Sequence, residues 1–466
     1  MKEPDQRVGT AQDPTNGKPV DLSEARSWDA QHSWHPFTPM QQYLDSDPLM
    51  IVQGKGMRIQ DSEGKWYWDG CSSVWLNIHG HRHPYLDAAI VRQLNQVAHV
   101  SMLGQANVPA SLLARRLVEI APAGLSRVHL SDCGATAVEI AVKTAIQFWF
   151  NQGQPEKRCV IGFKDNYHGD TLGAMAVAPS EYFHKPFLKM LPINYQLPYP
   201  VCPDQPLVSK EDRCEETLGQ PLVDYLQEHA ATTAAVIVEP VEGAGGMLPA
   251  PPGFLKLLRE ICDRFDVLLI IDEVATGFGH TGDLFACTAE DVTPDLLCLG
   301  KGISGGYLPV AATLSTEKIY QAFLGEIREG KTLYHGHSFA GNPLGCAVSL
   351  ASLDLMPKVV SGLPPKVELI RQKLAGLEGV AHIQQVRQRG FMVGITVCQE
   401  DGSPYDPALR AGYVVAEKAR QLGLVLRPIG DVVILLPPPA ISLEELAELM
   451  DIFVESFRQA EWPSVD

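Results

Sequence analysis

The chain has 466 residues, of which 45% are hydrophobic and 20% charged, as expected of a soluble globular protein with a large core. Its formal net charge of −17 gives a surface that repels phosphate backbones, so nucleic acid is not an expected partner. No apolar run reaches the length of a membrane span, and the polar N-terminus lacks the pattern of a signal peptide. We therefore expect a cytoplasmic enzyme that does not contact membranes.

The ten cysteines are scattered along the chain, without the Cys-x-x-Cys or Cys/His spacing of a metal site. Most of them lie in apolar stretches, where a free cysteine packs as a small hydrophobe. This pattern indicates a reducing compartment and no bound metal.

The beginning of the chain divides into two segments. Residues 1–27 are polar and acidic and are expected to form a flexible leader. Residues 28–84 contain strand-like runs on either side of Gly64, which predict a small antiparallel hairpin.

Residues 85–345 show a different pattern, in which helical stretches alternate with short apolar runs: RVHLSD, RCVIGFKD, AAVIVEP, VLLIIDE and DLLCLGK. Such runs suit strands that are buried on both faces, and the alternation with helices predicts an α/β fold with a mainly parallel sheet. Residues 346–466 combine amphipathic helices with strands and predict an α+β region.

Ligands of open α/β sheets bind beyond the carboxyl ends of the strands, so the residues that follow the apolar runs are the candidates. Gly134 follows one run and begins a helical pattern, whose free N–H groups could bind a phosphate; a simple turn is the alternative. Asp272 and Glu273 end a very apolar run. A buried acid needs a cation, which the protonated pyridine nitrogen of pyridoxal phosphate would supply; an ion pair or a helix cap is the alternative.

Lys301 follows the next apolar run, inside a glycine-rich turn. Desolvation would lower the pKa of its amine and free it to form a Schiff base, whereas a lysine that reaches the surface is the simpler interpretation. Asp272 precedes Lys301 by about one strand–helix–strand unit, so the two strand ends could face one pocket.

Three further segments contain polar side chains suited to a ligand site. Tyr167 could stack on a planar ring or pack against a helix. His168 could donate a hydrogen bond behind it, although a hydrogen bond to the local backbone is the favoured interpretation. In YHGHSFAGNP, Gly336 could let a substrate approach and Ser338 could donate to a phosphate, although a plain loop has the same composition. Arg427 lies between apolar runs and suits either a substrate carboxylate or an internal ion pair.

The order of these segments resembles the fold-type I, class III aminotransferases that use pyridoxal phosphate. The motifs DEVATGFGHTG, GKGISGG and HGHSFAGNP carry this resemblance, which spans nearly the whole chain after the leader. It implies a large, mainly parallel-sheet domain over residues 85–345 and a small α+β domain built from residues 28–84 and 346–466. Within the class, the chain is most similar to members that aminate 8-amino-7-oxononanoate in biotin biosynthesis, through SWHPFTPM, CSSVWLNIHGHRHP, YHGDTLGAM and LVLRPIGDVVILLPPP.

The resemblance implies roles for the residues of the cofactor site. Lys301 would form the Schiff base and move the proton, Asp272 would hold the pyridine nitrogen protonated, and Tyr167 would lie over the ring or line the cleft. Gly134 and Ala135 would bind the phosphate through backbone N–H groups.

The resemblance also implies a homodimer with shared active sites. His337 and Ser338 would complete the phosphate site of the neighbouring subunit. Gly336 and Arg427 would contact the substrate, with Arg427 on the carboxylate of 8-amino-7-oxononanoate.

Several positions depart from the family pattern. Ala135 stands where Ser or Thr is frequent, and His280 stands where Arg is usual. Phe37 and Val74 stand where members that use S-adenosylmethionine often have Tyr and Trp, which leaves Trp75 as the second of a Trp pair. Phe37, Val74 and Trp75 would line an apolar cleft, with either S-adenosylmethionine or lysine as amino donor. Other class III ω-aminotransferases, acting on ornithine, β-alanine or aryl amines, are the alternative, and a decarboxylase or an aminomutase comes after them.

Overall fold

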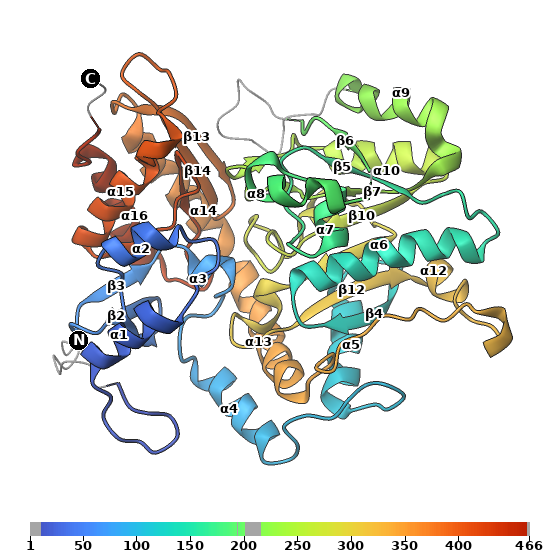
Figure 1. Ribbon diagram of the computed structural model, residues 1–466, viewed down its shortest axis with the longest axis horizontal. Helices are drawn as coiled ribbons and strands as arrows, with labels where there is room; N and C mark the ends of the chain where they lie inside the picture. Colours follow the sequence, from blue (N-terminus) through green and yellow to red (C-terminus); the bar gives the residue numbers. More distant parts are fainter. Residues whose placement is uncertain (1–10, 193, 201–215, 464–466) are drawn as a thin grey trace.

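A seven-stranded sheet forms the centre of the larger part of the molecule (Figure 1). The computed structural model describes residues 11–192, 194–200 and 216–463. The strand order is β4-β12-β11-β10-β7-β5-β6, and within it β12 runs antiparallel to both of its neighbours. The strands are β4 (Leu125–Ser131), β5 (Cys159–Phe163), β6 (Tyr195–Leu197), β7 (Thr233–Val238), β10 (Leu268–Asp272), β11 (Leu296–Leu299) and β12 (Ala311–Thr316).

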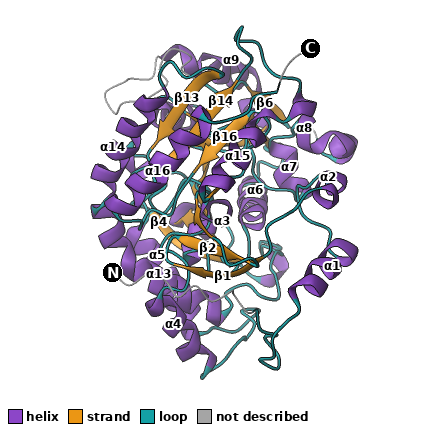
Figure 2. Ribbon diagram, turned by 90° about the vertical axis from the view of Figure 1, so that its left-hand side faces the viewer, coloured by secondary structure: helices purple, strands orange, loops and turns teal. Residues whose placement is uncertain are grey.

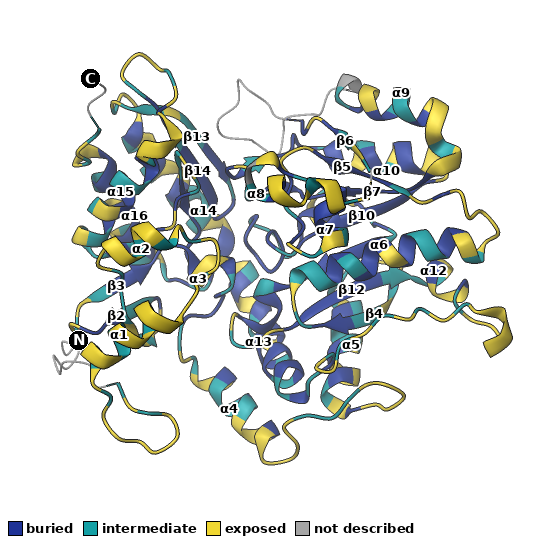
Figure 3. Ribbon diagram, in the orientation of Figure 1, coloured by how far each residue is buried: buried dark blue, intermediate teal, exposed yellow. Residues whose placement is uncertain are grey.

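The prediction of a mainly parallel sheet is confirmed, and each of the five apolar runs forms a strand. Every residue of β7, β10 and β11 is buried, because helices cover both faces of the sheet (Figure 3). These helices and the short helices beside them are α4 (Pro84–Leu94), α5 (Val108–Ile120), α6 (Gly134–Asn151), α7 (Leu172–Val177), α8 (Glu181–His184), α9 (Gln220–His229), α10 (Phe254–Arg264), α11 (Ala286–Ala289), α12 (Glu317–Gln321) and α13 (Pro343–Ser361).

The smaller part of the molecule combines the N-terminal and C-terminal segments, blue and red in Figure 1, which lie side by side there; this part faces the viewer in Figure 2. In one sheet the predicted hairpin strands β1 (Ile51–Lys55), β2 (Arg58–Asp61) and β3 (Trp66–Asp69) are joined by β15 (Leu424–Val425), which pairs with β3 in parallel. The C-terminal region adds a second sheet and three helices: β13 (Ile383–Arg389), β14 (Met392–Val397), β16 (Val432–Leu435), α14 (Leu363–Leu374), α15 (Ala411–Leu422) and α16 (Leu443–Arg458). The predicted small α+β region is therefore confirmed.

The N-terminal segment corrects one prediction. Helix α1 (Leu22–His32) begins inside residues 1–27, which were predicted to be a flexible leader. The Asp21 carboxylate caps this helix by accepting hydrogen bonds from the first-turn N–H groups. Arg26, within the helix, donates hydrogen bonds to the Asp47 side chain and to the backbone oxygen of Pro48. The helix buries no residue completely, so its hydrophobic pattern did not reveal it. Residues 1–10 lie outside the described part of the chain.

Helix α13 connects the two parts of the molecule, and the predicted boundary between residues 345 and 346 falls near its start. Among the described residues it is the one helix that is long and apolar enough to span a membrane, but half of its apolar segment is buried inside the protein. It packs against α4 and α5, so we assign it to the protein core.

Candidate active site

A cavity of about 650 Å³ opens at the carboxyl ends of the central strands. Six of the residues predicted for the site line it, together with several polar residues that follow the strands. The six are Trp75, Gly134, Ala135, Tyr167, Asp272 and Lys301. Residues from five different strand ends and from the small part of the molecule thus meet in one place.

Asp272 is the last residue of β10 and is only 4% exposed. Its Oδ2 lies 2.7 Å from Nδ1 of His168, and its Oδ1 accepts a hydrogen bond from the backbone N–H of Val274 at 3.0 Å. Because a carboxylate only accepts hydrogen bonds, the His168 proton lies on Nδ1. His168 therefore fixes the orientation of the Asp272 carboxylate from behind the cavity.

Lys301 follows β11, the parallel neighbour of β10, and its φ of 42° places its backbone in the left-handed region. Burial lowers the pKa of its amine to about 8, an effect that the negative charges of Glu239 and Asp272 partly oppose. The Nζ atom lies 4.4 Å from the centre of the Trp75 ring. A substantial fraction of this amine is therefore neutral, and nucleophilic, near pH 8.

Helix α6 points its N-terminus into the cavity. The first N–H groups of a helix have no partner within it, so those of Gly134 and Ala135 are available to an anion. A Cβ atom on Gly134 would lie 2.5 Å from a methyl group of Val274, and one on Gly169 would lie 2.3 Å from Cβ of Ala135. Glycine is therefore required at both positions for the chain to pass this closely.

Tyr167 follows β5 and forms one wall of the cavity. Its hydroxyl donates to Asp170 at 2.6 Å, and burial together with this carboxylate raises its pKa, so the phenol stays protonated. The ring of Phe37 lies edge-on at 6.3 Å from the ring of Tyr167, and Phe183 contacts both. Phe37 is 56% exposed and lies beside the cavity wall.

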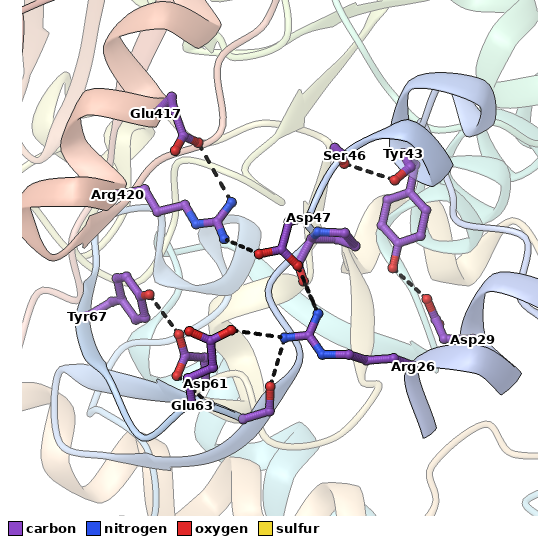
Figure 4. Close-up of polar contacts among 12 residues, drawn as sticks. Arg26, Asp29, Tyr43, Ser46, Asp47, Asp61, Glu63, Tyr67, Glu417 and Arg420 are labelled. Atoms are coloured by element: carbon purple, nitrogen blue, oxygen red, sulfur yellow. Dashed lines mark hydrogen bonds and ion pairs between the residues drawn. The ribbon is translucent and has the colours of Figure 1, made fainter. Parts of the chain in front are cut away.

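The loop that carries Phe37 is held at both ends by polar contacts (Figure 4). Arg26 of α1 donates to Asp47 at 3.1 Å, and Tyr43 of α2 (Met40–Asp45) donates to Asp29 of α1 at 2.5 Å. Together with the hydrogen bond from Arg26 to Ser62, which follows β2, these contacts fix α1 and α2 to each other and to the small sheet. Phe37, between the two helices, lies against Tyr167 of the cavity wall.

The remaining predicted residues do not line the cavity within this single chain. Val74 is 41% exposed, beside the buried Trp75. Gly336 and Ser338 are exposed and His337 is half-buried, in the loop that precedes α13. Arg427 is exposed after β15 and forms no ion pair with any residue that the structure describes.

Two buried groups of the site, Glu239 and His168, were given no firm role in the sequence. Glu239 directly follows β7, and burial raises its pKa to about 8. It accepts a hydrogen bond from the backbone N–H of Tyr167 at 2.7 Å. Glu239 lies directly after an apolar strand and His168 lies in the loop after one, and these positions were the available signal.

His280, which replaces the usual Arg, is 1% exposed. Its Nδ1 donates to the backbone oxygen of Ala275 at 2.9 Å, and its Nε2 has no partner among the described residues. Burial lowers its pKa to about 4, and the positive charge of Lys301 adds to this effect. The position therefore holds a neutral imidazole where a guanidinium would bring a permanent charge.

The residues present fit pyridoxal phosphate. The helix N-terminus suits the phosphate, the buried Asp272 suits a protonated ring nitrogen, and the partly buried amine of Lys301, which lines the cavity, suits an aldehyde. Glycine at positions 134 and 169 lets the backbone at the anion site pack closely against Val274 and Ala135.

Comparisons with known proteins agree with this geometry. The family model described as aminotransferase class-III matches residues 41–457. The adenosylmethionine-8-amino-7-oxononanoate aminotransferase of Geobacter sulfurreducens is 46% identical over 92% of this chain and 96% of its own, and that of Aquifex aeolicus is 42% identical over 95% and 99%. The crystal structure of the Methanocaldococcus jannaschii protein of that name superposes with a TM-score of 0.88, at 40% identity, over 95% of this chain and all of that one. An (S)-enantioselective omega-transaminase from Thermomicrobium roseum superposes at 0.87, with 29% identity, over 95% of this chain and 99% of its own.

Proposed function

Since the chain belongs to the class III aminotransferases, we propose that it transfers an amino group from S-adenosylmethionine to 8-amino-7-oxononanoate. The product, 7,8-diaminononanoate, is an intermediate of biotin biosynthesis. The enzyme depends on pyridoxal phosphate, as its family does. The observation that carries the proposal is the placement of Lys301 and Asp272 at the ends of two adjacent parallel strands, facing one cavity, in a chain similar over 92% of its length to an enzyme of this name.

Bound pyridoxal phosphate supplies an aldehyde that takes up the amine and a ring that accepts the electrons of the broken C–H bond. Asp272, oriented by His168, is placed to hold the proton on the ring nitrogen. The N–H groups of Gly134 and Ala135 would bind the phosphate.

Lys301 is assigned two tasks, attachment of the cofactor and proton transfer. Burial lowers the pKa of its Nζ to about 8, so near neutrality the amine can both accept a proton and return it. Trp75 covers this amine and excludes water from it.

The substrate is a long acid with an apolar middle, so its site needs an apolar wall and a cation at the far end. Phe37, Val74 and Trp75 are proposed to provide the wall. Arg427, which has no carboxylate partner among the described residues, is proposed to bind the substrate carboxylate, with Gly336 beside the substrate.

We also propose that the active enzyme is a homodimer. The exposed loop with His337 and Ser338 lies outside its own cavity, which suits a contribution to the phosphate site of the neighbouring subunit. We place the enzyme in the cytoplasm, where its free cysteines would stay reduced.

The choice of substrates can be tested with purified holoenzyme. We expect 7,8-diaminononanoate to form when 8-amino-7-oxononanoate is offered with S-adenosylmethionine, and much more slowly when lysine replaces it. Faster turnover with lysine would contradict the proposed donor. Faster amination of pyruvate than of 8-amino-7-oxononanoate would instead favour a general ω-aminotransferase.

A further inference from the structure

The segment that carries Trp75 has an unusual backbone. Four consecutive residues, Ser72 to Trp75, have φ values of 48°, 51°, 67° and 68° and form one left-handed turn, α3 (Ser72–Trp75). None of them is glycine, and a left-handed conformation is unfavourable for an L-residue because its Cβ atom approaches the following carbonyl oxygen. Such strain persists only where the surroundings impose it, and it is concentrated at functional sites.

Asp69 is the group that holds this turn from its N-terminal side. It ends β3 and is 2% exposed. Its Oδ1 accepts from the backbone N–H of Ser73 at 2.9 Å, and its Oδ2 accepts from the Ser73 hydroxyl at 2.8 Å and lies 3.0 Å from Nε2 of His81. Three donors thus compensate for the burial of the carboxylate and fix Ser73 in the turn.

A second contact holds the turn from the C-terminal region of the chain. The Ser72 hydroxyl donates to the backbone oxygen of Leu436 at 2.6 Å, and this oxygen directly follows β16. The turn is therefore attached to both sequence segments that build the small part of the molecule.

The turn places the Trp75 ring against the large part of the molecule. The ring centre lies 4.4 Å from Nζ of Lys301. A Cβ atom on Gly243 would lie 3.0 Å from the ring, so a larger residue at this position would crowd Trp75. Trp75 is consequently 9% exposed, although Val74 beside it is 41% exposed.

We propose that Asp69 is a positioning residue for the transamination, because it holds the left-handed turn that keeps the Trp75 ring over the amine of Lys301. This role rests on the proposed function. Without the carboxylate, the N–H and hydroxyl of Ser73 lose their acceptors and the turn can relax toward right-handed geometry. Trp75 would then leave the cavity, uncover Lys301 to water and remove part of the apolar wall.

A double-mutant cycle tests this coupling in the full-length holoenzyme. We expect Asp69→Ala and Trp75→Ala each to raise the KM for 8-amino-7-oxononanoate about tenfold, and the double variant to resemble Trp75→Ala alone. Asp69→Asn, whose amide oxygen can still accept from the Ser73 N–H, should recover part of the loss. Asp61→Asn is the matched control, since Asp61 is equally buried in the same sheet but holds a turn remote from Trp75.

A second measurement does not depend on substrate turnover. In cofactor-stripped protein, the pH midpoint for capture of added pyridoxal phosphate reports the pKa of Lys301, which burial lowers to about 8. Loss of the Trp75 ring has two opposite effects on the pKa of Lys301: exposure to water raises it, and loss of the attraction between the ring and the ammonium lowers it. We expect the first effect to be larger, so the midpoint should rise by about one pH unit in Asp69→Ala and in Trp75→Ala. If Asp69→Ala does not fold, Ser73→Ala, which removes one hydrogen bond, should shift both readouts in the same direction by a smaller amount.

Two results would overturn the role of Asp69. One is that Asp69→Ala raises KM by the same factor in the wild-type background and in the Trp75→Ala background, which would show that the two residues act independently. The other is an unchanged pH midpoint in Asp69→Ala or, if that variant does not fold, in Ser73→Ala. If the wild-type enzyme fails to aminate 8-amino-7-oxononanoate while the pH midpoints move as expected, the proposed substrate is wrong and the role of Asp69 stands.

Discussion

Single buried side chains determine the chemistry of the cavity. Burial lowers the pKa of Lys301 and raises that of Glu239, and both come to about 8. The two groups thus titrate over the same pH range. From the sequence, Lys301 was a candidate for the Schiff-base lysine because it follows an apolar run. A lysine whose side chain reaches the surface was also compatible with that position. Its neighbours Glu239 and Trp75 come from other segments, so their effect on it could not be predicted from local sequence.

The pKa of Lys301 leads to a pH prediction. The neutral amine is the nucleophile, so the rate at which stripped protein captures pyridoxal phosphate should rise with pH and reach half its plateau near pH 8. An ordinary lysine, with a pKa of about 10.4, would be under about 1% neutral at that pH. The growth of visible absorbance after mixing, measured from pH 6.5 to 10, gives the midpoint. A midpoint near that of an ordinary lysine would show that the amine is not buried.

His168 is expected to act through Asp272. Replacing His168 by Ala removes the hydrogen bond to Oδ2 and lets the carboxylate rotate. A hydrogen bond to a charged group contributes about 1.5–3 kcal/mol, so kcat should fall about 10- to 100-fold. His168→Asn, whose amide can replace Nδ1 as donor, should recover much of that loss. Equal activity of His168→Ala and wild type in steady-state assays would remove His168 from the site.

At the scale of elements, the packing of strand ends against helix α6 creates the proposed phosphate site. The alternation of apolar runs with helices was sufficient to predict β4, β5, β7, β10 and β11; four of them are buried on both faces or nearly so, and β4 is buried in part. The sequence did not reveal β12, which returns antiparallel between β4 and β11. It did not reveal the left-handed turn α3 either, because no glycine marks it.

The close contact at the start of α6 can be tested by compensation. Gly134→Ala would place a Cβ atom 2.5 Å from Val274, whose branched side chain has little freedom to move. We expect the helix N-terminus to shift and the dissociation constant of pyridoxal phosphate to rise at least about tenfold. Adding Val274→Ala removes the clashing methyl groups and should restore most of the affinity. An unrestored double variant, measured by equilibrium titration of cofactor absorbance, would show that the contact with Val274 is not the cause.

At the scale of the whole molecule, two segments far apart in sequence build one small part (Figure 1). Trp75 of this part lines the cavity of the large part. The parallel pairing of β15 with β3 and the contacts of Arg26 and Tyr43 produce this arrangement. No local pattern predicts such pairings, and the assignment of both chain ends to one domain came from the family resemblance. The same long-range contacts explain why residues 22–27 are helical although they were predicted to belong to a flexible leader.

The proposed sharing of sites between subunits predicts complementation. Lys301→Ala and Ser338→Ala homodimers should each be impaired, but a mixed dimer has one site in which both residues are intact. Random mixing should therefore recover about a quarter of wild-type activity. The measurement is diamine formation after the two variants are unfolded and refolded together, compared with each variant refolded alone. Activity no higher than the average of the two variants would place Ser338 in its own subunit's site or outside any site.

The most direct test of the account is to follow the amino group itself. Holoenzyme is given 8-amino-7-oxononanoate and S-adenosylmethionine labelled with ¹⁵N in its α-amine, and the diamine is analysed by mass spectrometry. We predict that the label appears at the carbon that carried the ketone, over many turnovers in the wild type and in none with Lys301→Ala. Unlabelled product, no diamine, or multiple turnovers by Lys301→Ala would contradict the account.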